Sequence, residues 1–290
     1  YTFYNQLSYN PSLYQALKNI VYKLFYTTNG VIGTPVNVCY TYIVLFIIFG
    51  AFLERTGIAN FFIALANRLA GWSAGGPAKV AVISSALCGM VSGSSVGNTV
   101  TTGSVTIPMM KKTGYHPDFA GAVEAAASTG GQIMPPIMGA AAFLMAEYMD
   151  LPYATVAVKA ILPAVLYFTG IFISVHLEAK KLGLKGLSKD EMPKWSFLLQ
   201  KIYLLAPLVL LVWLVSSGAK TMQFSAAVSI LAAIIVGFLN KDERLTLKKI
   251  FEALEAGAKG AITVGVACAI AGMIAGCITV TGLASILINA

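Results

Sequence analysis

The chain has 290 residues, of which 57% are hydrophobic and only 11% are charged. An ordinary soluble domain carries about 25% charged residues, so this composition excludes a water-soluble protein and indicates a membrane protein. The net charge of +8 is typical of basic residues that collect in cytoplasmic loops, and it requires neither nucleic acid nor an acidic partner.

Residues 1–35 are predicted to form an interfacial segment and a loop before the first membrane span. From Pro11 to Phe25 apolar residues recur with helical spacing while Lys18 and Lys23 stay on the other side, as in a helix that lies in the membrane interface. The chain opens on Tyr1 without Met and stops inside an apolar stretch. We therefore expect it to be part of a longer protein.

Residues 36–195 are predicted to form a first structural repeat. It begins with a span from Val36 to Leu53 and a surface helix from Ile58 to Ala70. Lys79 to Met110 follows, with two apolar arms on either side of a polar stretch, and each arm is too short to cross a bilayer. We therefore expect a re-entrant hairpin over residues 80–107.

The second half of this repeat contains a helix that must be broken. Residues 118–149 are long enough to span, but Gly130-Gly131 and Pro135-Pro136 interrupt them in the middle. Proline removes a backbone donor and clashes with the preceding turn, and paired glycines weaken a helix further. A further span over residues 153–177 then closes the repeat.

Residues 196–256 are predicted to link the two repeats, with spans from Phe197 to Val215 and from Met222 to Leu239 and a cytoplasmic amphipathic helix from Leu245 to Leu254. Residues 257–290 begin a truncated second repeat, with a span from Gly257 to Val280. In this scheme most basic residues of the loops fall in the cytoplasm if the first span runs inward, whereas Glu147, Asp150 and Lys220 fall outside as a nearly neutral set.

A short internal similarity supports two repeats of opposite orientation. The first span leads into Thr56-Gly57-Ile58-Ala59 and the last into Thr281-Gly282-Leu283-Ala284. Because the first span enters and the last leaves, the copies are inverted, which is typical of secondary transporters. The predicted fold is thus an all-α polytopic membrane protein of the inverted-repeat ion-transporter type, with a re-entrant hairpin and a broken transmembrane helix, present in part.

The chain is not predicted to be an enzyme. Zinc proteolysis needs H-E-x-x-H, whereas the two histidines, His116 and His176, are sixty residues apart at loop edges. For a Ser-His-Asp arrangement, the sequence offers no second histidine or acid at membrane depth beyond Glu124. The cysteines lack C-x-x-C spacing and are expected to be buried free side chains rather than a disulfide or metal framework: Cys39, Cys88, Cys268 and Cys277.

Two polar stretches at membrane depth carry the candidate site: S-G-S-S-V-G-N-T-V-T-T-G, residues 92–103, and S-T-G-G-Q-I-M-P-P, residues 128–136. Non-helical backbone survives there only where protein or a water-filled cavity satisfies it, so we expect both to face one cavity. The polar side chains that they offer are Ser94, Ser95, Asn98, Thr99, Thr101, Ser128, Thr129 and Gln132.

Neutral oxygens suit a hard monovalent cation, and the N-termini of half-helices attract anionic groups, so sodium with a carboxylate substrate fits these stretches. The alternative stays open, because small and hydroxylated residues also let membrane helices pack closely. We favour packing or bonds to the local backbone for Ser92, Thr102 and Ser104.

Glu124 is an acid inside the broken span, and such residues are candidates for function because they are costly there. It lies one helical turn before Ser128, on the same face. A buried hydrogen bond and a proton-carrying role are both open. A structural bond between this helix and the hairpin is the interpretation that we favour.

With these stretches in view, the chain resembles the large membrane subunit of a TRAP transporter (tripartite ATP-independent periplasmic), of the TAXI type with fused membrane parts. The resemblance runs from about Gly30 to Ala290. The passages that carry it are Phe49-Gly50-Ala51-Phe52-Leu53, Gly75-Gly76-Pro77-Ala78-Lys79-Val80-Ala81, Ser92 to Asn98, Thr106-Ile107-Pro108-Met109-Met110-Lys111, Ala122-Val123-Glu124-Ala125 and Pro135 to Phe143.

The resemblance implies an elevator-type carrier in the bacterial or archaeal inner membrane. It implies sodium-coupled uptake of organic acids that a periplasmic binding protein delivers, with a small membrane subunit fused upstream and no cofactor besides the coupling ion. The sodium ligands that it implies are Ser94, Ser95, Asn98, Thr99, Gly130 and Gly131. The substrate-binding residues that it implies are Ser95, Thr99, Thr101, Gln132 and Pro135.

The resemblance also implies a second hairpin and a second broken helix, which carry the other half of the site and which these 290 residues do not contain. On that basis we do not expect the chain to transport alone. The TAXI type of TRAP transporter suggests dicarboxylates or amino-acid-like acids as substrates. A non-transporting structural or assembly subunit, and another sodium and carboxylate symporter of similar architecture, remain as alternatives.

Overall fold

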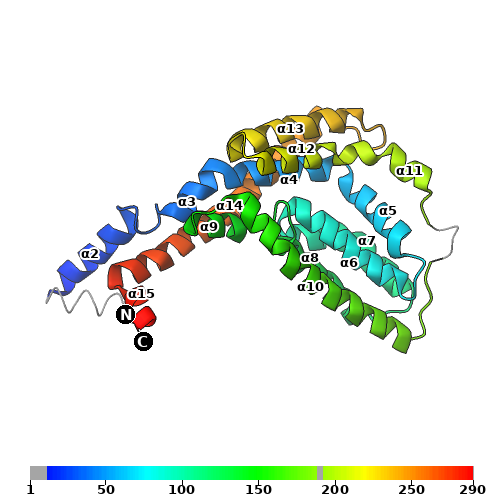
Figure 1. Ribbon diagram of the computed structural model, residues 1–290, viewed down its shortest axis with the longest axis horizontal. Coiled ribbons are helices and arrows are strands. Elements are labelled where there is room, and N and C mark those ends of the chain that lie inside the picture. The colour runs from blue at the N-terminus through cyan, green and yellow to red at the C-terminus, as the bar shows by residue number, and fades with distance from the viewer. Residues whose placement is uncertain (1–11, 188–191, 290) are drawn as a thin grey trace. The chain divides into compact units, whose positions relative to one another are not determined.

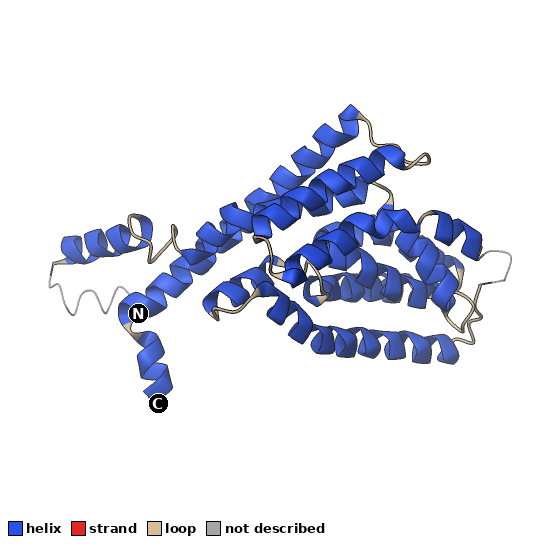
Figure 2. Cartoon of the chain, turned by 45° about the horizontal axis from the view of Figure 1, so that its top comes forward, coloured by secondary structure: helices blue, strands red, loops and turns tan. Residues whose placement is uncertain are grey.

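The computed structural model describes residues 12–187 and 192–289. Throughout this described part the regular structure is helical, and Figure 2 shows no strand in it. The predicted all-α fold is therefore confirmed. The chain divides into two compact units, residues 1–44 with 258–290 and residues 45–257.

The first unit joins the two ends of the chain. It holds α2 (Leu13–Phe25), α3 (Thr34–Val38), the π-helix η1 (Cys39–Ile43), the later part of α14 (Leu247–Thr281) and α15 (Leu283–Asn289). Its backbones approach closely, since a Cβ on Gly276 would lie 1.8 Å from the carbonyl oxygen of Asn29. Such contacts through small residues are how membrane helices pack without a hydrophobic driving force.

The second unit contains the two polar stretches. In chain order it comprises α4 (Val44–Arg55), α5 (Ile58–Ala70), α6 (Gly76–Ser92), α7 (Ser95–Lys112), α8 (Pro117–Gly130), the 3₁₀ turn η2 (Gly131–Ile133), α9 (Ala140–Tyr148), α10 (Tyr153–Lys181), α11 (Trp195–Gln200), η4 (Ile202–Leu205), α12 (Ala206–Ser217) and α13 (Met222–Leu239). Figure 1 shows α6 and α7 beside α8; these three helices pack on one another, and α6 and α8 also pack on α10.

Four helices in the described residues are long and apolar enough to cross a membrane: Thr34–Arg55, Tyr153–Lys181, Met222–Leu239 and Leu247–Thr281. They contain the predicted spans Val36 to Leu53, 153–177, Met222 to Leu239 and Gly257 to Val280. The first has a π-helical turn at Cys39–Ile43 that the sequence pattern did not predict. The helix Leu13–Phe25 at the start and Ile58–Ala70 after the first span are also confirmed as helices.

Two boundaries predicted in the linking region are wrong. The span from Phe197 to Val215 is divided, because α11 ends at Gln200 and α12 begins at Ala206 with Pro207 in its first turn. Proline suits a first turn, where its missing N–H leaves no bond unmade. The predicted break between Leu254 and Gly257 does not occur, since a lone glycine does not stop a helix, and α14 runs through it.

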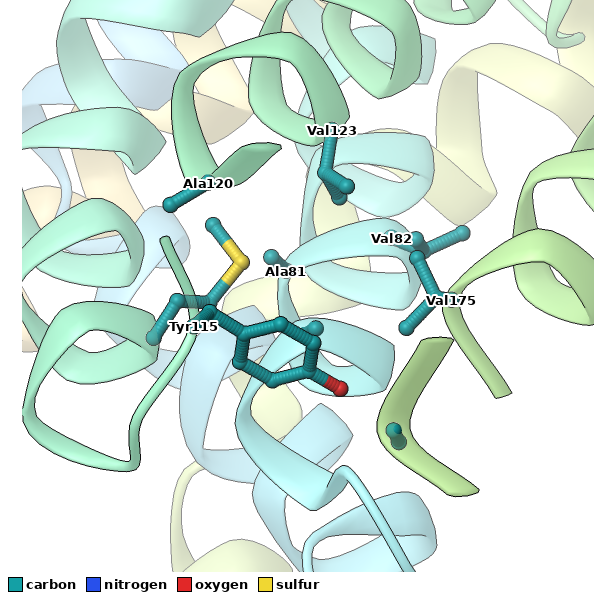
Figure 3. Close-up of a cluster of buried hydrophobic side chains, with 9 residues drawn as sticks. Ala81, Val82, Tyr115, Ala120, Val123 and Val175 are labelled. Atoms are coloured by element: carbon teal, nitrogen blue, oxygen red, sulfur yellow. The ribbon is translucent and has the colours of Figure 1, made fainter. Parts of the chain in front are cut away.

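The core of the second unit is built from small side chains of α6, α8 and α10 around one aromatic ring. Figure 3 shows Ala81 and Val82 of α6 facing Val123 of α8 and Val175 of α10, with Tyr115 beside them. Tyr115 lies in the turn between α7 and α8, and burial, reinforced by the charge of Glu178, raises its pKa to about 12. This core fixes α8 against the α6–α7 pair and so positions the site.

Candidate functional site

The turn between α6 and α7 is a two-residue connection made by caps. Gly93 ends α6 in the left-handed conformation, with φ of 61°, which glycine adopts without strain. Ser94 begins α7 as its N-cap, and its Oγ accepts a hydrogen bond of 3.2 Å from the backbone N–H of Gly97. We call residues 92–99 the hairpin tip. Whether the hairpin is re-entrant stays a prediction.

The broken helix lies against this tip, as the sequence predicted. α8 ends at Gly130, one 3₁₀ turn follows, and α9 begins at Ala140. The amide of Ile137 in the break donates to the carbonyl of Met90 on α6 (3.3 Å), and the side-chain Nε2 of Gln132 donates to Oγ of Ser95 (2.9 Å). The two polar stretches therefore meet.

Two glycines make this meeting possible. A Cβ on Gly131 would lie 2.6 Å from Cα of Gly89, and a Cβ on Gly89 would lie 2.3 Å from Cα of Gly131. Either contact is with backbone and cannot be relieved by turning a side chain. The backbones of α6 and η2 thus touch at a point that only glycine allows.

Asn98 lies beside this crossing and is 1% exposed. Its Nδ2 donates to the carbonyl of Ser85 on α6 (2.8 Å), while its Oδ1 is buried and accepts no hydrogen bond. A buried acceptor without a partner costs about 1–3 kcal/mol. An amide oxygen in this state is a ligand of the kind that a hard cation takes.

The other predicted sodium ligands are arranged less uniformly. The hydroxyl of Thr99 donates to the carbonyl of Ser95 (2.8 Å) and keeps its lone pairs free. Gly131 lies at the crossing, but a Cβ on Gly130 would meet the rings of Tyr167 and Phe168 at 2.5 and 2.8 Å. Gly130 is therefore required for packing against α10, whatever its carbonyl binds. The role of each as a ligand stays a prediction.

The predicted substrate-binding residues also lie around the tip and the break. Gln132 is exposed and Ser95 half-buried, so their hydrogen bond faces accessible space. Thr101 is half-buried and donates to the carbonyl of Gly97 (2.9 Å). Pro135 is half-buried and forms a cis peptide bond with Pro136.

Glu124 is fully buried among hydroxyl groups. Its Oε1 accepts from Ser85 (2.7 Å), Thr102 (2.5 Å) and Ser128 (3.0 Å), and its Oε2 accepts from Thr106 (2.5 Å). We call these residues the Glu124 cage. The favoured bond between helix and hairpin is present, and it joins α8 to both arms. Ser128 is directed to this cage and not to the tip.

Close approach between α7 and α8 lets the carboxylate reach the hairpin. A Cβ on Gly103 would lie 3.0 Å from Cγ of Glu124. The small residue in α7 thus leaves the space that the acid fills. Thr102, which was expected to bond to the local backbone, does so with the carbonyl of Asn98 (2.8 Å), but it also reaches Glu124.

Sequence reasoning missed two residues that support the site. Ser85 serves both clusters, since its hydroxyl binds Glu124 and its carbonyl binds Asn98. Tyr153, at the start of α10, donates its hydroxyl to the carbonyls of Pro136 (2.8 Å) and Ile137 in the break. An interruption of a helix frees carbonyls that need hydrogen-bond donors. A tyrosine close to the break in the sequence, such as Tyr153, could therefore have been predicted to supply one.

Other titratable groups are dispersed. All four cysteines are free thiols; three are buried, and Cys277 is only half-buried, which corrects its predicted burial. His116 is paired with Asp118 in an exposed contact of 3.4 Å. Within residues 12–187 and 192–289 there is no group of three or more His, Cys, Asp or Glu side chains that could hold a metal. The polar groups that converge are the neutral ones of the tip and, in the cage, the hydroxyls around Glu124.

Comparison with known proteins identifies relatives of this arrangement. The family model described as "Tripartite ATP-independent periplasmic transporter, DctM component" matches residues 3–290. Similar proteins include the C4-dicarboxylate TRAP transporter large permease protein of Pseudomonas aeruginosa, 26% identical over 69% of this chain and 47% of its own length. Another is a putative TRAP transporter large permease protein of Haemophilus influenzae, 28% identical over 74% of this chain and 50% of its own length.

A third relative is named for another substrate. The sialic acid TRAP transporter large permease protein of Vibrio cholerae is 26% identical over 72% of this chain and 49% of its own length. The chain thus spans about half the length of these curated relatives, which are named as permeases and not as enzymes. With the family model matched over nearly every residue, the chain belongs to the family of the DctM component, the large membrane permease of tripartite ATP-independent periplasmic transporters.

Proposed function

We propose that the chain supplies the hairpin tip and broken helix of a sodium-coupled secondary transporter that imports organic acids by an elevator-type movement. The observation that carries this proposal is the buried Oδ1 of Asn98, which has no hydrogen-bond donor. A cation at that atom would satisfy it. A neutral water could do so as well, and the sodium dependence of transport separates the two.

The chemistry around Asn98 fits sodium better than a transition metal. Its neighbours on the tip offer hydroxyl and carbonyl oxygens, with no cysteine or histidine among residues 92–99. Hard cations prefer such oxygen ligands, whereas softer metals select thiolate or imidazole. Ser94, Ser95, Thr99 and the backbone at Gly130 and Gly131 are the further oxygen donors that we propose.

The substrate is proposed to lie on the accessible side of the same tip, against Gln132, Ser95, Thr101 and Pro135. α7 begins at Ser95 and α9 at Ala140, and the start of a helix carries a partial positive charge that attracts a carboxylate. The relatives are named for C4-dicarboxylates and for sialic acid. Carboxylates are accordingly the substrate class to test.

The partners follow from the family. We propose that the whole transporter lies in the inner membrane and works with a periplasmic substrate-binding protein and a small membrane subunit. We further propose the TAXI type, in which that subunit is fused upstream. The upstream part of the reading frame that contains these residues tests the last point, and its downstream part must encode a second Gly- and Pro-interrupted hairpin if the protein is a transporter. Without that hairpin a structural role would replace transport.

The decisive experiment compares two buried asparagines in the same unit. Asn98 and Asn240 both donate Nδ2 to a backbone carbonyl at 2.8 Å, but Oδ1 of Asn240 accepts from the amide of Asp242 (3.2 Å) and Oδ1 of Asn98 accepts nothing. Asn98→Ala and Asn240→Ala therefore each remove one equivalent bond from Nδ2 to a backbone carbonyl. Only Asn98→Ala also removes an amide oxygen that accepts no hydrogen bond.

Uptake of a C4-dicarboxylate and of sialic acid is measured in proteoliposomes that hold the full-length transporter with its binding protein. For Asn98→Ala we expect the sodium concentration at half-maximal uptake to rise about tenfold, the effect of about 1.4 kcal/mol lost from one ligand. Asn240→Ala should leave it unchanged. Equal sodium dependence in both variants would remove Asn98 from the sodium site.

A further inference from the structure

The Glu124 cage holds a carboxylate in an unusual setting. Glu124 is fully buried, and none of the ion pairs found in the described part of the chain includes it. An ionised carboxylate in apolar surroundings is costly unless it is paired or fully hydrogen-bonded. Hydroxyls alone provide that compensation at Glu124.

The number of hydroxyl protons shows how the cage can respond. Each hydroxyl has one proton to donate, and Ser85, Thr102 and Thr106 each have more than one acceptor within reach, since Oγ of Ser85 and Oγ1 of Thr102 also lie 3.0 Å apart. Thr102 can donate to Glu124 or to the carbonyl of Asn98 (2.8 Å), and Thr106 can donate to Glu124 or to the carbonyl of Thr102 (3.0 Å). Rotation of a hydroxyl therefore changes the number of donors to the carboxylate.

The two carboxylate oxygens are unequal. Oε1 has three hydroxyl donors, whereas Oε2 has Thr106 alone. A proton arriving from water would bind Oε2, form the Oε2–H bond and donate to Oγ1 of Thr106. The proton of Thr106 would turn to the carbonyl of Thr102. No heavy atom has to move, so the cage accommodates both the ionised and the protonated acid.

We propose that Glu124 is a reversible proton-binding site of the permease, which takes up and releases a proton during the transport cycle. The part that concerns the transport cycle rests on the proposed function above, whereas the proton-binding site itself does not. Two residues of the cage also bond to Asn98. The carbonyl of Ser85 accepts from Nδ2 of Asn98, and the hydroxyl of Thr102 lies within hydrogen-bond distance of the carbonyl of Asn98. Protonation of Glu124 thus turns the hydroxyl of Thr106 to the carbonyl of Thr102, whose own hydroxyl lies 2.8 Å from the carbonyl of Asn98.

The titratable groups on the packed helices leave Glu124 without a counter-ion. α6 presents the buried thiol of Cys88 and Lys79, which donates to Oγ of Ser73 (3.0 Å). Lys79 lies six residues before Ser85, about 9 Å along the helix.

Among the neighbouring helices, α5 presents Arg68, whose guanidinium lies over the ring of Trp195, 5.4 Å from its centroid, and not at the cage. α10 presents Tyr167, whose hydroxyl donates to the carbonyl of Ala126 (2.9 Å), and η2 presents no titratable side chain. The remaining titratable residues of α7, α8 and α10 lie toward the helix ends: Lys111, Lys112, Asp118, Tyr153, Lys159, His176, Glu178, Lys180 and Lys181.

The first test is an infrared titration of the purified full-length protein. The carbonyl band of a protonated carboxylic acid is followed against pH in the wild type and in Glu124→Gln, with Asp118→Asn as the control on the same helix, because Asp118 is exposed. We expect one component of this band to grow reversibly as pH falls, to be missing from Glu124→Gln and to persist in Asp118→Asn. A Glu124 that stays ionised, or stays protonated, at every pH where the protein is folded overturns the proposal.

Thr106→Val gives a second titration that does not depend on the behaviour of the glutamine variant. It keeps the shape of the side chain and removes the one donor to Oε2. Hydrogen bonds to an ionised group are stronger than those to a neutral one. The ionised form therefore loses more, and we expect the acid band to appear at a higher pH. An unchanged titration would contradict the role of Thr106 as the donor to Oε2.

The second test separates a proton carrier from a structural tie. One N–H of Glu124→Gln can donate to Thr106 as the protonated acid would, so this variant mimics the protonated state. We expect concentrative uptake to fall about tenfold or more while exchange of internal for external substrate stays within about twofold of the wild type. Equal losses in both, or none in either, overturn the transport role. If the wild type shows no uptake at all, the proposed function fails, and the infrared result still decides the proton site.

Discussion

The hairpin tip and the Glu124 cage are built on the same helices but satisfy their polar atoms differently. In the cage, four hydroxyls surround one carboxylate and each oxygen has a donor. At the tip, Oδ1 of Asn98 is as deeply buried and has none. A cluster that satisfies itself can hold helices together, whereas an oxygen without a donor indicates a position for a ligand.

Ser85 links the two regions, with its hydroxyl in the cage and its carbonyl at the tip. One residue of α6 thus takes part in both regions, since its hydroxyl bonds to Glu124 and its carbonyl bonds to Asn98. Substitutions on either side of Ser85 should separate a loss of stability from a loss of ion binding.

Glu124→Ala should have the largest effect on stability. It removes the acceptor of four hydroxyls, leaves Ser85 without that partner and opens a cavity between α7 and α8. Hydrogen bonds to charged groups are worth about 1.5–3 kcal/mol each and are not additive, so we expect about 3 kcal/mol of destabilisation in thermal or denaturant unfolding of the purified protein. A loss below about 1 kcal/mol would show that the cage does not hold the helices together.

Gly131→Ala should have the next largest effect and should act on the tip. Its Cβ would meet Cα of Gly89 at 2.6 Å, so α6 and the break must separate, at about 1–3 kcal/mol. Gly121→Ala is the matched control, since a Cβ there has nothing within 4 Å and alanine favours a helix. Equal melting temperatures for the two variants would contradict the close crossing.

Tyr153→Phe should have a moderate effect confined to the broken segment. It removes one hydroxyl that serves the carbonyls of Pro136 and Ile137 and keeps the ring stacked on Phe143, 4.3 Å between centroids. We expect about 1 kcal/mol of destabilisation and faster hydrogen exchange in residues 134–139. Unchanged exchange would mean that the break is held by other contacts.

Ser95→Ala should have the smallest effect on stability, below about 0.5 kcal/mol, because its partner Gln132 is exposed and water can replace the bond. If the pair binds substrate, the KM for uptake should rise in Ser95→Ala while the melting temperature stays constant. Ser104→Ala, an exposed residue of the same helix whose hydroxyl bonds only to the carbonyl of Thr101 in the described contacts, serves as control. A similar KM in both would remove Ser95 from the substrate site.

Local chemistry predicted much of this arrangement from the sequence. Gly93 and Ser94 are capping residues, so the position of the turn could be read directly, and Gly130 to Pro136 could only break a helix. Ser128 could be paired with Glu124 because both lie on one face of α8, four residues apart. Each of these inferences needed only residues close together in the chain.

Contacts between helices could not be predicted in the same way. The bonds from Ser85 and Thr106 to Glu124 and the missing donor at Asn98 depend on how α6, α7 and α8 pack. The error at Phe197 to Val215 has a different cause, because hydrophobicity was given more weight there than the local signal of Pro207. Proline early in an apolar run was the signal for a new helix.

Sodium-dependent thermal stability tests the central claim most directly, because it requires neither substrate nor partner. The melting temperature of the purified full-length protein is compared in sodium and in potassium at equal ionic strength, for the wild type, Asn98→Ala and Asn240→Ala. A ligand that binds only the folded state stabilises it by about 2.7 kcal/mol at one hundred times its dissociation constant. We predict a full sodium shift in the wild type and in Asn240→Ala and a shift of about half that size in Asn98→Ala, because tenfold weaker binding leaves about 1.4 kcal/mol. A full sodium shift in Asn98→Ala would contradict the account.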